Sequence, residues 1–200
     1  SDDPVYLSKS IAEFERTISV TRKLNSFFPK QNNPVLVLNA GGFTTGHALS
    51  VEEREALYTR LKVVLSDINL NGINLAIQTM PPFPWHFGGQ SYHNLFMDPD
   101  EIVEFSNAMG TSVCLDISHS QLACKHFGWN LHEFCKKVAP WVSHIHLSDS
   151  EGVDGEGLQV GDGEIDFTEL ANIFSSFLPN IQFLPEIWQG HKNNGEGFWL

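Results

Sequence analysis

Positively charged residues are scarce in this sequence: 12 lysines and arginines face 24 aspartates and glutamates, which gives a formal net charge of -12. Binding to a nucleic-acid backbone depends on clustered cations, so this balance argues against nucleic acid as a partner. No apolar run approaches the roughly 20 residues of a membrane span. The opening SDDPVYLSKS also lacks the charged-then-apolar order of a signal peptide. We expect a soluble chain with no membrane partner.

Cysteines are few as well. Cys114, Cys124 and Cys135 lie far apart, form no C-x-x-C pair and are odd in number. A disulfide framework of the secreted kind is therefore not expected, and we predict a reduced, cytoplasmic chain. The 200 residues are 42% hydrophobic, enough to bury one core. No low-complexity linker interrupts them, which predicts a single domain over residues 1–200.

Strand-like and helix-like segments alternate along the chain with short connections, the pattern of βα units around a parallel sheet. Each strand-like segment is largely apolar, as expected for a strand that is covered on both faces. The predicted strands span residues 34–42, 73–80, 112–119, 141–149 and 181–189. The predicted helices span residues 6–28, 51–69, 98–109, 120–138 and 166–178.

Polar residues gather at or just after the carboxyl ends of the predicted strands. That edge is where ligands bind in parallel α/β folds, in a barrel as in an open sheet. Any single member could be a strand-end residue with only structural hydrogen bonds. A structural distribution would scatter such residues over both edges, so the whole set predicts a site. Its members are Asn39, Gln78, Asp116, His119, His146, Asp149 and Glu186.

The densest group of acidic side chains follows the fourth predicted strand, in HIHLSDSEGVDGEGLQVGDGEIDF, residues 144–167. Histidine together with aspartate and glutamate indicates a cation or proton transfer. We expect the carboxylates of this turn and its glycine N–H groups to bind a polyhydroxyl ligand. The end of the segment also predicts a helix start, with Asp166 as N-cap and Glu169 completing a capping box.

Three short motifs resemble, in their order and spacing, the xylose-isomerase-like TIM-barrel superfamily of sugar isomerases, epimerases and AP-endonuclease-type proteins. They are CLDISH at 114–119, HIHLSD at 144–149 and LPEIWQG at 184–190. The resemblance covers nearly the whole chain and implies an α/β fold with a TIM-barrel-like parallel sheet and alternating helices. The five strands match about the third to seventh of eight. The expected fold is thus an incomplete (β/α)8 barrel, which we interpret as a fragment of a longer chain.

The resemblance also implies a divalent metal ion at the barrel mouth, with Mn, Mg, Zn and Co as candidates. The positions that match the family's ligands are Gln78, Asp116, His146 and Glu186. The family usually has glutamate where this chain has Gln78. An amide carbonyl can still bind a cation, but it adds no charge and cannot act as a base. Glu186 is then the expected catalytic base, and His119 is expected to act on the substrate beside it.

The implied substrate is a sugar or sugar derivative, which a metal-assisted isomerase or epimerase deprotonates next to its carbonyl group. The aromatic loop at 80–94 predicts either a lid over the mouth or a loop that packs its rings on the barrel. His191 and Lys192 are the cations best suited to an acidic group on the substrate. The expected substrate-binding residues are Asn39, Trp85, His86, Asp154, Glu156, His191 and Lys192.

Two other functions stay open. A barrel that binds a carbohydrate or serves as a scaffold, without chemistry, would be compatible with Gln78. An endonuclease-type phosphodiesterase is less favoured, because Asn39 and Glu156 stand where those relatives carry histidine and because the chain is acidic. A homo-oligomer is compatible with the sequence, which names neither the sugar nor the metal.

Overall fold

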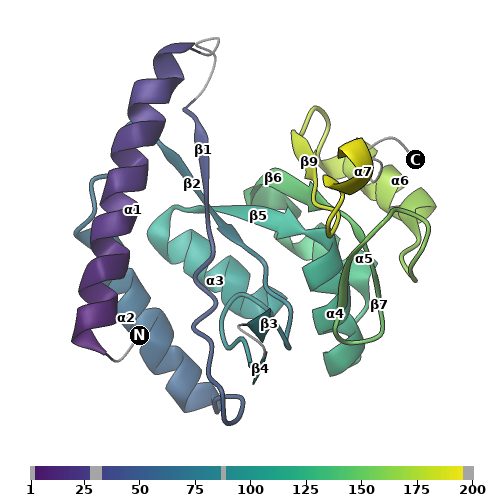
Figure 1. Cartoon of the computed structure of the whole chain (residues 1–200), viewed down its shortest axis with the longest axis horizontal. Coiled ribbons are helices and arrows are strands. Elements are labelled where there is room, and N and C mark those ends of the chain that lie inside the picture. Colours follow the sequence, from purple (N-terminus) through teal and green to yellow (C-terminus); the bar gives the residue numbers. More distant parts are fainter. Residues whose placement is uncertain (1–2, 28–32, 87–88, 196–200) are drawn as a thin grey trace.

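The computed structural model describes residues 3–27, 33–86 and 89–195, and its centre is a five-stranded parallel sheet (Figure 1). The strands follow one another across the sheet in chain order, and every neighbouring pair is parallel. They lie where the sequence predicts them but are shorter. Their bounds are β1 (Val35–Leu38), β2 (Asn74–Gln78), β5 (Ser112–Asp116), β6 (Val142–Leu147) and β9 (Phe183–Pro185).

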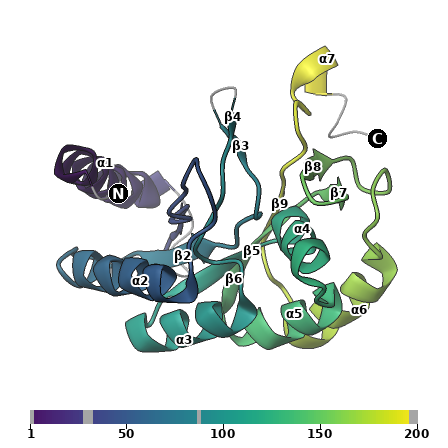
Figure 2. The same ribbon diagram turned by 90° about the horizontal axis from the view of Figure 1, so that it is seen from below.

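Helices alternate with these strands, and α2, α3, α5 and α6 form a layer along one face of the sheet (Figure 2). The sheet curls into half of a barrel, so the predicted α/β fold, an incomplete TIM barrel, is confirmed. None of the described helices is both long and apolar enough to cross a membrane. The bounds are α1 (Pro4–Leu24), α2 (Val51–Ser66), α3 (Pro99–Met109), α4 (Ile117–Phe127), α5 (Leu131–Val138) and α6 (Phe167–Phe177).

The single helix predicted over residues 120–138 is wrong, because the structure has two helices there. α4 begins directly after β5, with Asp116 as its N-cap, and it ends at Gly128 in the left-handed conformation. α5 then starts at a new N-cap, Asn130, whose side chain accepts a hydrogen bond from the Glu133 N–H. Glycine after a helix and asparagine before one are common stop and start signals, so the break was visible in the sequence.

The helix start predicted after the acidic turn is confirmed in part. The Asp166 side chain accepts hydrogen bonds from the backbone N–H groups of Thr168 and Glu169 at the first turn of α6. The Glu169 carboxylate, however, lies 3.1 Å from Nδ1 of His132. Glu169 therefore connects α6 to α5 rather than completing the predicted capping box.

Two hairpins rise from the loops at the carboxyl ends of the strands. The loop at 80–94 contains β3 (Trp85–His86) and β4 (Gly89–Gln90), and the acidic turn contains β7 (Asp149–Glu151) and β8 (Gly155–Leu158). The β3–β4 loop packs partly on the barrel side, since the Phe83 ring lies edge-on to Tyr92 and to His126. Three short helices, η1 (Asn25–Phe27), η2 (Ala139–Trp141) and α7 (Lys192–Gly195), complete the described elements.

The hydrophobic core lies between the sheet and the helix layer. Ile77, Leu115 and Ile145 come from three neighbouring strands and are almost completely buried. Phe105 of α3 and Leu170 of α6 pack into the same cluster. Each of these three strand residues is followed directly by a polar one at the carboxyl end of its strand. Because side chains alternate between the two faces of a sheet, these polar side chains point away from the core.

Candidate active site

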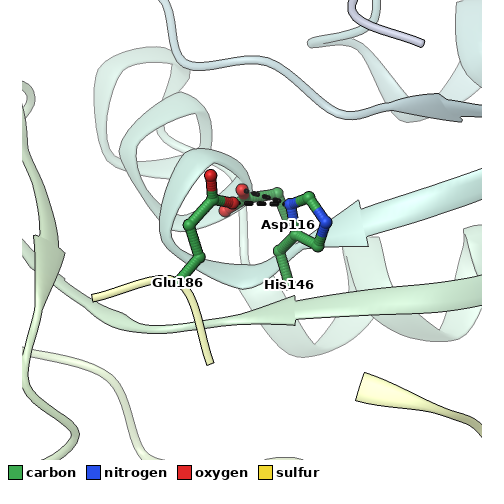
Figure 3. A group of neighbouring side chains, drawn as sticks. All are labelled: Asp116, His146 and Glu186. Carbon is green, nitrogen blue, oxygen red and sulfur yellow. Dashed lines mark ion pairs between the residues drawn. The ribbon is translucent and has the colours of Figure 1, made fainter. Parts of the chain in front are cut away.

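Three of the predicted cation ligands lie together at the carboxyl ends of β5, β6 and β9 (Figure 3). Asp116 ends β5, His146 lies on β6, and Glu186 follows β9 directly. One ligand atom from each residue lies within 4.8 Å of the others. His146 Nδ1 is 2.5 Å from Glu186 Oε2 and 3.6 Å from Asp116 Oδ2. The predicted convergence of these side chains is confirmed.

The register of the sheet explains this convergence. Asp116 pairs with His146 across β5 and β6, and His146 pairs with Leu184 across β6 and β9. Glu186 comes two residues after Leu184, so it projects to the same face in an extended chain. Because parallel strands end at one edge, the three side chains meet there although they are far apart in sequence.

Gln78, the fourth predicted ligand, points its amide at the same cluster. Its Nε2 donates a hydrogen bond of 2.9 Å to Asp116 Oδ2 and lies 3.2 Å from His146 Nδ1. The amide nitrogen therefore contacts the two atoms that would face a cation. An amide can turn by half a rotation and present its carbonyl oxygen instead.

Burial and charge act against each other in this cluster. Burial opposes ionisation of Asp116, but the nearby His119 and His146 rings and a hydrogen bond from Gln78 hold the pKa of this carboxyl below its usual value. Burial likewise opposes protonation of His146, but the neighbouring Asp116 carboxylate, the Cys114 thiol and the Glu186 carboxylate raise its pKa well above the ordinary value. The cluster thus holds a proton on His146 between two carboxylates when no cation is bound. A cation that binds through Nδ1 must displace that proton.

These residues fit a divalent cation. Two carboxylates, one imidazole nitrogen and one amide oxygen form a donor set that zinc, manganese and magnesium all accept in proteins. Asp116 and His146 are buried, whereas the Glu186 side chain is 52% exposed. The ligand that a substrate can reach is therefore Glu186.

His119 lies beside the cluster in the first turn of α4. Its Nδ1 is 3.0 Å from the Thr79 carbonyl oxygen and 3.2 Å from Asp116 Oδ2, and its Nε2 is 3.4 Å from Glu156 Oε2. Burial opposes its protonation, but the carboxylates of Asp116 and Glu156 raise the pKa of His119 to about 9. Both ring nitrogens thus face acceptors, so His119 is suited to donate a proton and not to accept one.

The other predicted substrate-binding residues are more scattered. Asn39 accepts a hydrogen bond from the Gly41 N–H and lines a cavity of about 550 Å³ between α1, α2 and β1. Asp154 is an exposed residue of the turn between β7 and β8 and does not belong to the cluster of ligand atoms found among the described residues. His191 and Lys192 are exposed and follow Glu186 into α7.

Trp85 and His86 form the short strand β3, but the positions of their side chains lie outside what the structure describes. Their predicted contact with the substrate therefore stays a prediction. Of the residues expected from the acidic turn, Glu156 is the one that the structure places next to His119.

The acidic turn is organised around Asp149, whose side chain is fully buried. Its Oδ1 accepts hydrogen bonds from the N–H groups of Ser150 (2.8 Å) and Ile165 (3.1 Å). Its Oδ2 accepts from the N–H groups of Gly161 and Gly163, each at 3.0 Å. The prediction that the glycine N–H groups bind a polyhydroxyl ligand is wrong for these two glycines, because a carboxylate of the chain itself occupies them.

Sequence reasoning missed the buried hydroxyl groups that hold Asp116 in place. The Thr79 Oγ1 accepts a hydrogen bond of 2.9 Å from the Asp116 N–H, and the Ser120 Oγ donates one of 2.6 Å to the Asp116 carbonyl oxygen. The two hydroxyl groups also lie 3.0 Å from each other. Thr79 follows Gln78 directly at the end of a predicted strand, and this position was the one sequence feature that could have pointed to it.

A family model described as xylose isomerase-like TIM barrel matches residues 1–198. The chain belongs to this family. The resemblance inferred from the three short motifs is therefore confirmed, and the xylose isomerase-like barrel fold accounts for the parallel half-barrel.

Other proteins are similar to this chain in sequence or in fold. An uncharacterized protein of Methanocaldococcus jannaschii is 32% identical over 123 residues, which are 61% of this chain and 41% of that protein. A D-tagatose 3-epimerase-like protein has 19% identity and a TM-score of 0.66, with 92% of this chain and 64% of that chain covered. The IOLI protein, in a structure with a binding zinc atom, has 15% identity and a TM-score of 0.69, with 98% and 68% covered. This xylose isomerase-like chain thus spans about two thirds of these structures and less than half of the curated relative.

The four hydrogen bonds to Asp149 predict a large effect of removing its charge. We expect Asp149→Asn to lower the free energy of unfolding by about 2–4 kcal/mol, because an amide can accept at one oxygen but not at two. Chemical denaturation measures this loss. Asp162→Asn, on an exposed residue of the same turn, is the matched control and should change stability by less than about 0.5 kcal/mol. Equal effects of the two substitutions would contradict the anchoring role of Asp149.

Because Gln78 adds no charge to the site, we expect that replacing it with a carboxylate increases the affinity for a metal ion. We expect Gln78→Glu to tighten binding of Zn²⁺ or Mn²⁺ about tenfold or more, because a third carboxylate adds charge to a partly buried site. Titration calorimetry on the metal-free protein measures the affinity. Asn39→Asp adds the same charge at another strand end and should leave the affinity almost unchanged. Equal affinities of Gln78→Glu and the unaltered protein would show that residue 78 does not contact the cation.

Proposed function

We propose that this chain carries the catalytic residues of a metal-assisted sugar isomerase or epimerase, which removes a proton from a carbon next to a carbonyl group. The observation that carries the proposal is the cluster of Asp116, His146 and Glu186 at the strand ends. Membership of the xylose isomerase-like family supports the reaction class, and a D-tagatose 3-epimerase-like protein among the similar structures supports a sugar as substrate.

Each residue of the cluster has a part in this reaction. When bound, a divalent cation stabilises the negative charge that develops on substrate oxygen atoms. Asp116 and His146, which are buried, hold the cation, and the exposed carboxylate of Glu186 takes the proton from the substrate carbon. His119 bears a proton next to Glu156 and can donate it to a substrate oxygen.

The amide of Gln78 narrows the choice of reaction. Inversion of a stereocentre by two opposed bases needs a second carboxylate across the substrate from Glu186, and Gln78 cannot accept a proton. Proton transfer on one face of the substrate needs Glu186 alone. We therefore propose aldose–ketose isomerisation ahead of two-base epimerisation, with a small-molecule sugar as the substrate of the intact protein.

A second candidate is a barrel that binds a carbohydrate without chemistry. The position of the Gln78 amide favours it, because Nε2 donates a hydrogen bond to Asp116 Oδ2 and lies next to His146 Nδ1, so the amide nitrogen stands where a cation would be held. An endonuclease-type phosphodiesterase has less support. Glu156 contributes a carboxylate where those relatives have an imidazole, and the chain is strongly acidic.

The proposed base can be tested directly. We expect Glu186→Gln to lower the rate of solvent-deuterium incorporation into a ketose substrate by about 10²–10⁴-fold, because a positioned base is lost while the side-chain shape is kept. Mass spectrometry of the sugar, with the intact protein and added Mn²⁺, Mg²⁺, Zn²⁺ or Co²⁺, measures the exchange. The control is Glu151→Gln, on an exposed carboxylate of β7.

Two outcomes of this experiment would change the account. Full activity of the Glu186→Gln variant would show that another residue is the base. Binding of sugars by the unaltered protein without deuterium exchange, with every metal, would favour the non-catalytic barrel.

A further inference from the structure

Glu186, the residue on which the proposed function rests, directly follows the short strand β9. β9 has three residues, all exposed, and it pairs with β6 along one side. The Glu186 N–H extends this pairing by donating to the Leu147 carbonyl oxygen at 3.0 Å. The strand pairing ends at Pro185 and this one hydrogen bond, so the direction of the Glu186 side chain also depends on how the chain beyond it is held.

A second segment, β8, holds the chain just beyond Glu186. The Trp188 N–H donates a hydrogen bond of 2.7 Å to the Gly157 carbonyl oxygen. On its other side, the Gly157 N–H donates to Ser118 Oγ at 3.1 Å. Ser118 is almost completely buried and lies two residues after Asp116, in the first turn of α4. One residue of β8 therefore connects the helix that Asp116 caps to the segment that carries Glu186.

Residue 157 must be glycine for this connection. Its φ of 74° lies in the left-handed region, which disfavours other residues. A Cβ atom there would lie 3.0 Å from Cβ of Trp188 and 3.2 Å from its backbone nitrogen. The Trp188 side chain is 71% exposed, so burial of the indole does not explain the close approach of the two segments. The backbone hydrogen bonds account for it.

The base of the same hairpin is firmly attached to the rest of the fold. The buried carboxylate of Asp149 accepts four backbone hydrogen bonds at one end of β7. The Glu164 N–H donates to the Ser150 carbonyl oxygen, and the Glu164 carboxylate lies 2.6 Å from the Lys125 ammonium group of α4. The hairpin that carries β8 is therefore attached to the fold at its base through β7.

We propose that Gly157 and Ser118 are positioning residues for Glu186: through Trp188, they hold the backbone that directs the Glu186 carboxylate onto His146. Neither residue belongs to the cluster of ligand atoms found among the described residues. Their effect passes through the 2.5 Å contact between Glu186 Oε2 and His146 Nδ1, which is the contact that a displaced backbone would lengthen. This inference rests on the proposed role of Glu186.

The first test uses the nitrogen-15 resonances of the His146 ring in the metal-free protein. Glu186→Gln shifts them by weakening the contact to Nδ1. We expect Gly157→Ala and Ser118→Ala to shift them in the same direction. Gly152→Ala is the matched control, because Gly152 has a similar φ of 67° in the same hairpin but a Cβ there meets no atom within 4 Å. It should leave the His146 resonances in place.

The second test is a double-mutant cycle on Zn²⁺ affinity, measured by calorimetry. We expect Gly157→Ala and Ser118→Ala each to weaken binding about tenfold in the unaltered background, the usual effect of losing a residue that orients a ligand. In the Glu186→Gln background, the same substitutions should weaken binding less than about twofold, because the residue they position is already changed. If the Gly157→Ala variant does not fold, the cycle with Ser118→Ala tests the inference by itself.

The outcomes separate this inference from the proposed function. If Glu186→Gln weakens binding but the two positioning variants do not, or if they weaken it equally in both backgrounds, the inference is wrong and the proposed function stands. If Glu186→Gln changes neither the His146 resonances nor the affinity, both are wrong.

Discussion

The register between β5, β6 and β9 is the constraint on which the candidate site depends. It sets Asp116, His146 and Leu184 side by side, and it brings Glu186 to the same face two residues later. A shift of one residue in either pairing would turn the side chains of one strand to the opposite face of the sheet. Strand pairing thus brings an acid, an imidazole and a second acid to the same edge of the sheet.

Once they meet, these groups compete for the same charges. Asp116 and Glu186 bring two negative charges to one imidazole, and the result without a cation is a proton on His146 and an amide hydrogen bond from Gln78. A bound cation would replace both. Metal binding at this site therefore requires a metal ion to outcompete one proton and one amide group, and residue 78 affects that balance because an amide adds no negative charge.

Much of this arrangement is readable from the sequence because it follows from local patterns. Alternating apolar segments predict the parallel sheet, and polar residues at strand ends predict Asp116, His146 and Glu186 as neighbours. The sequence pattern does not predict interactions in which a side chain binds the backbone of another segment. Nothing in the composition of the acidic turn distinguishes Asp149, which binds four backbone N–H groups, from Asp154, which is exposed.

Side chains with two available partners were equally hard to assign. Glu169 has the spacing of a capping box but contacts His132 on the neighbouring helix, a choice that depends on how α5 and α6 pack. The role of Gly157 is of the same kind. A glycine in a glycine-rich turn predicts flexibility, and only the contacts to Ser118 and Trp188 reveal that this one is held from both sides.

The most direct test of the account is anomalous X-ray diffraction from crystals of the intact protein grown with Zn²⁺ or Mn²⁺. The account predicts one strong anomalous peak at the carboxyl edge of the sheet, with ligand atoms of Asp116, His146 and Glu186 about 2.0–2.6 Å away and the Gln78 amide turned toward the ion. No peak at this edge at millimolar metal concentration, or a peak bound by other residues, would contradict it.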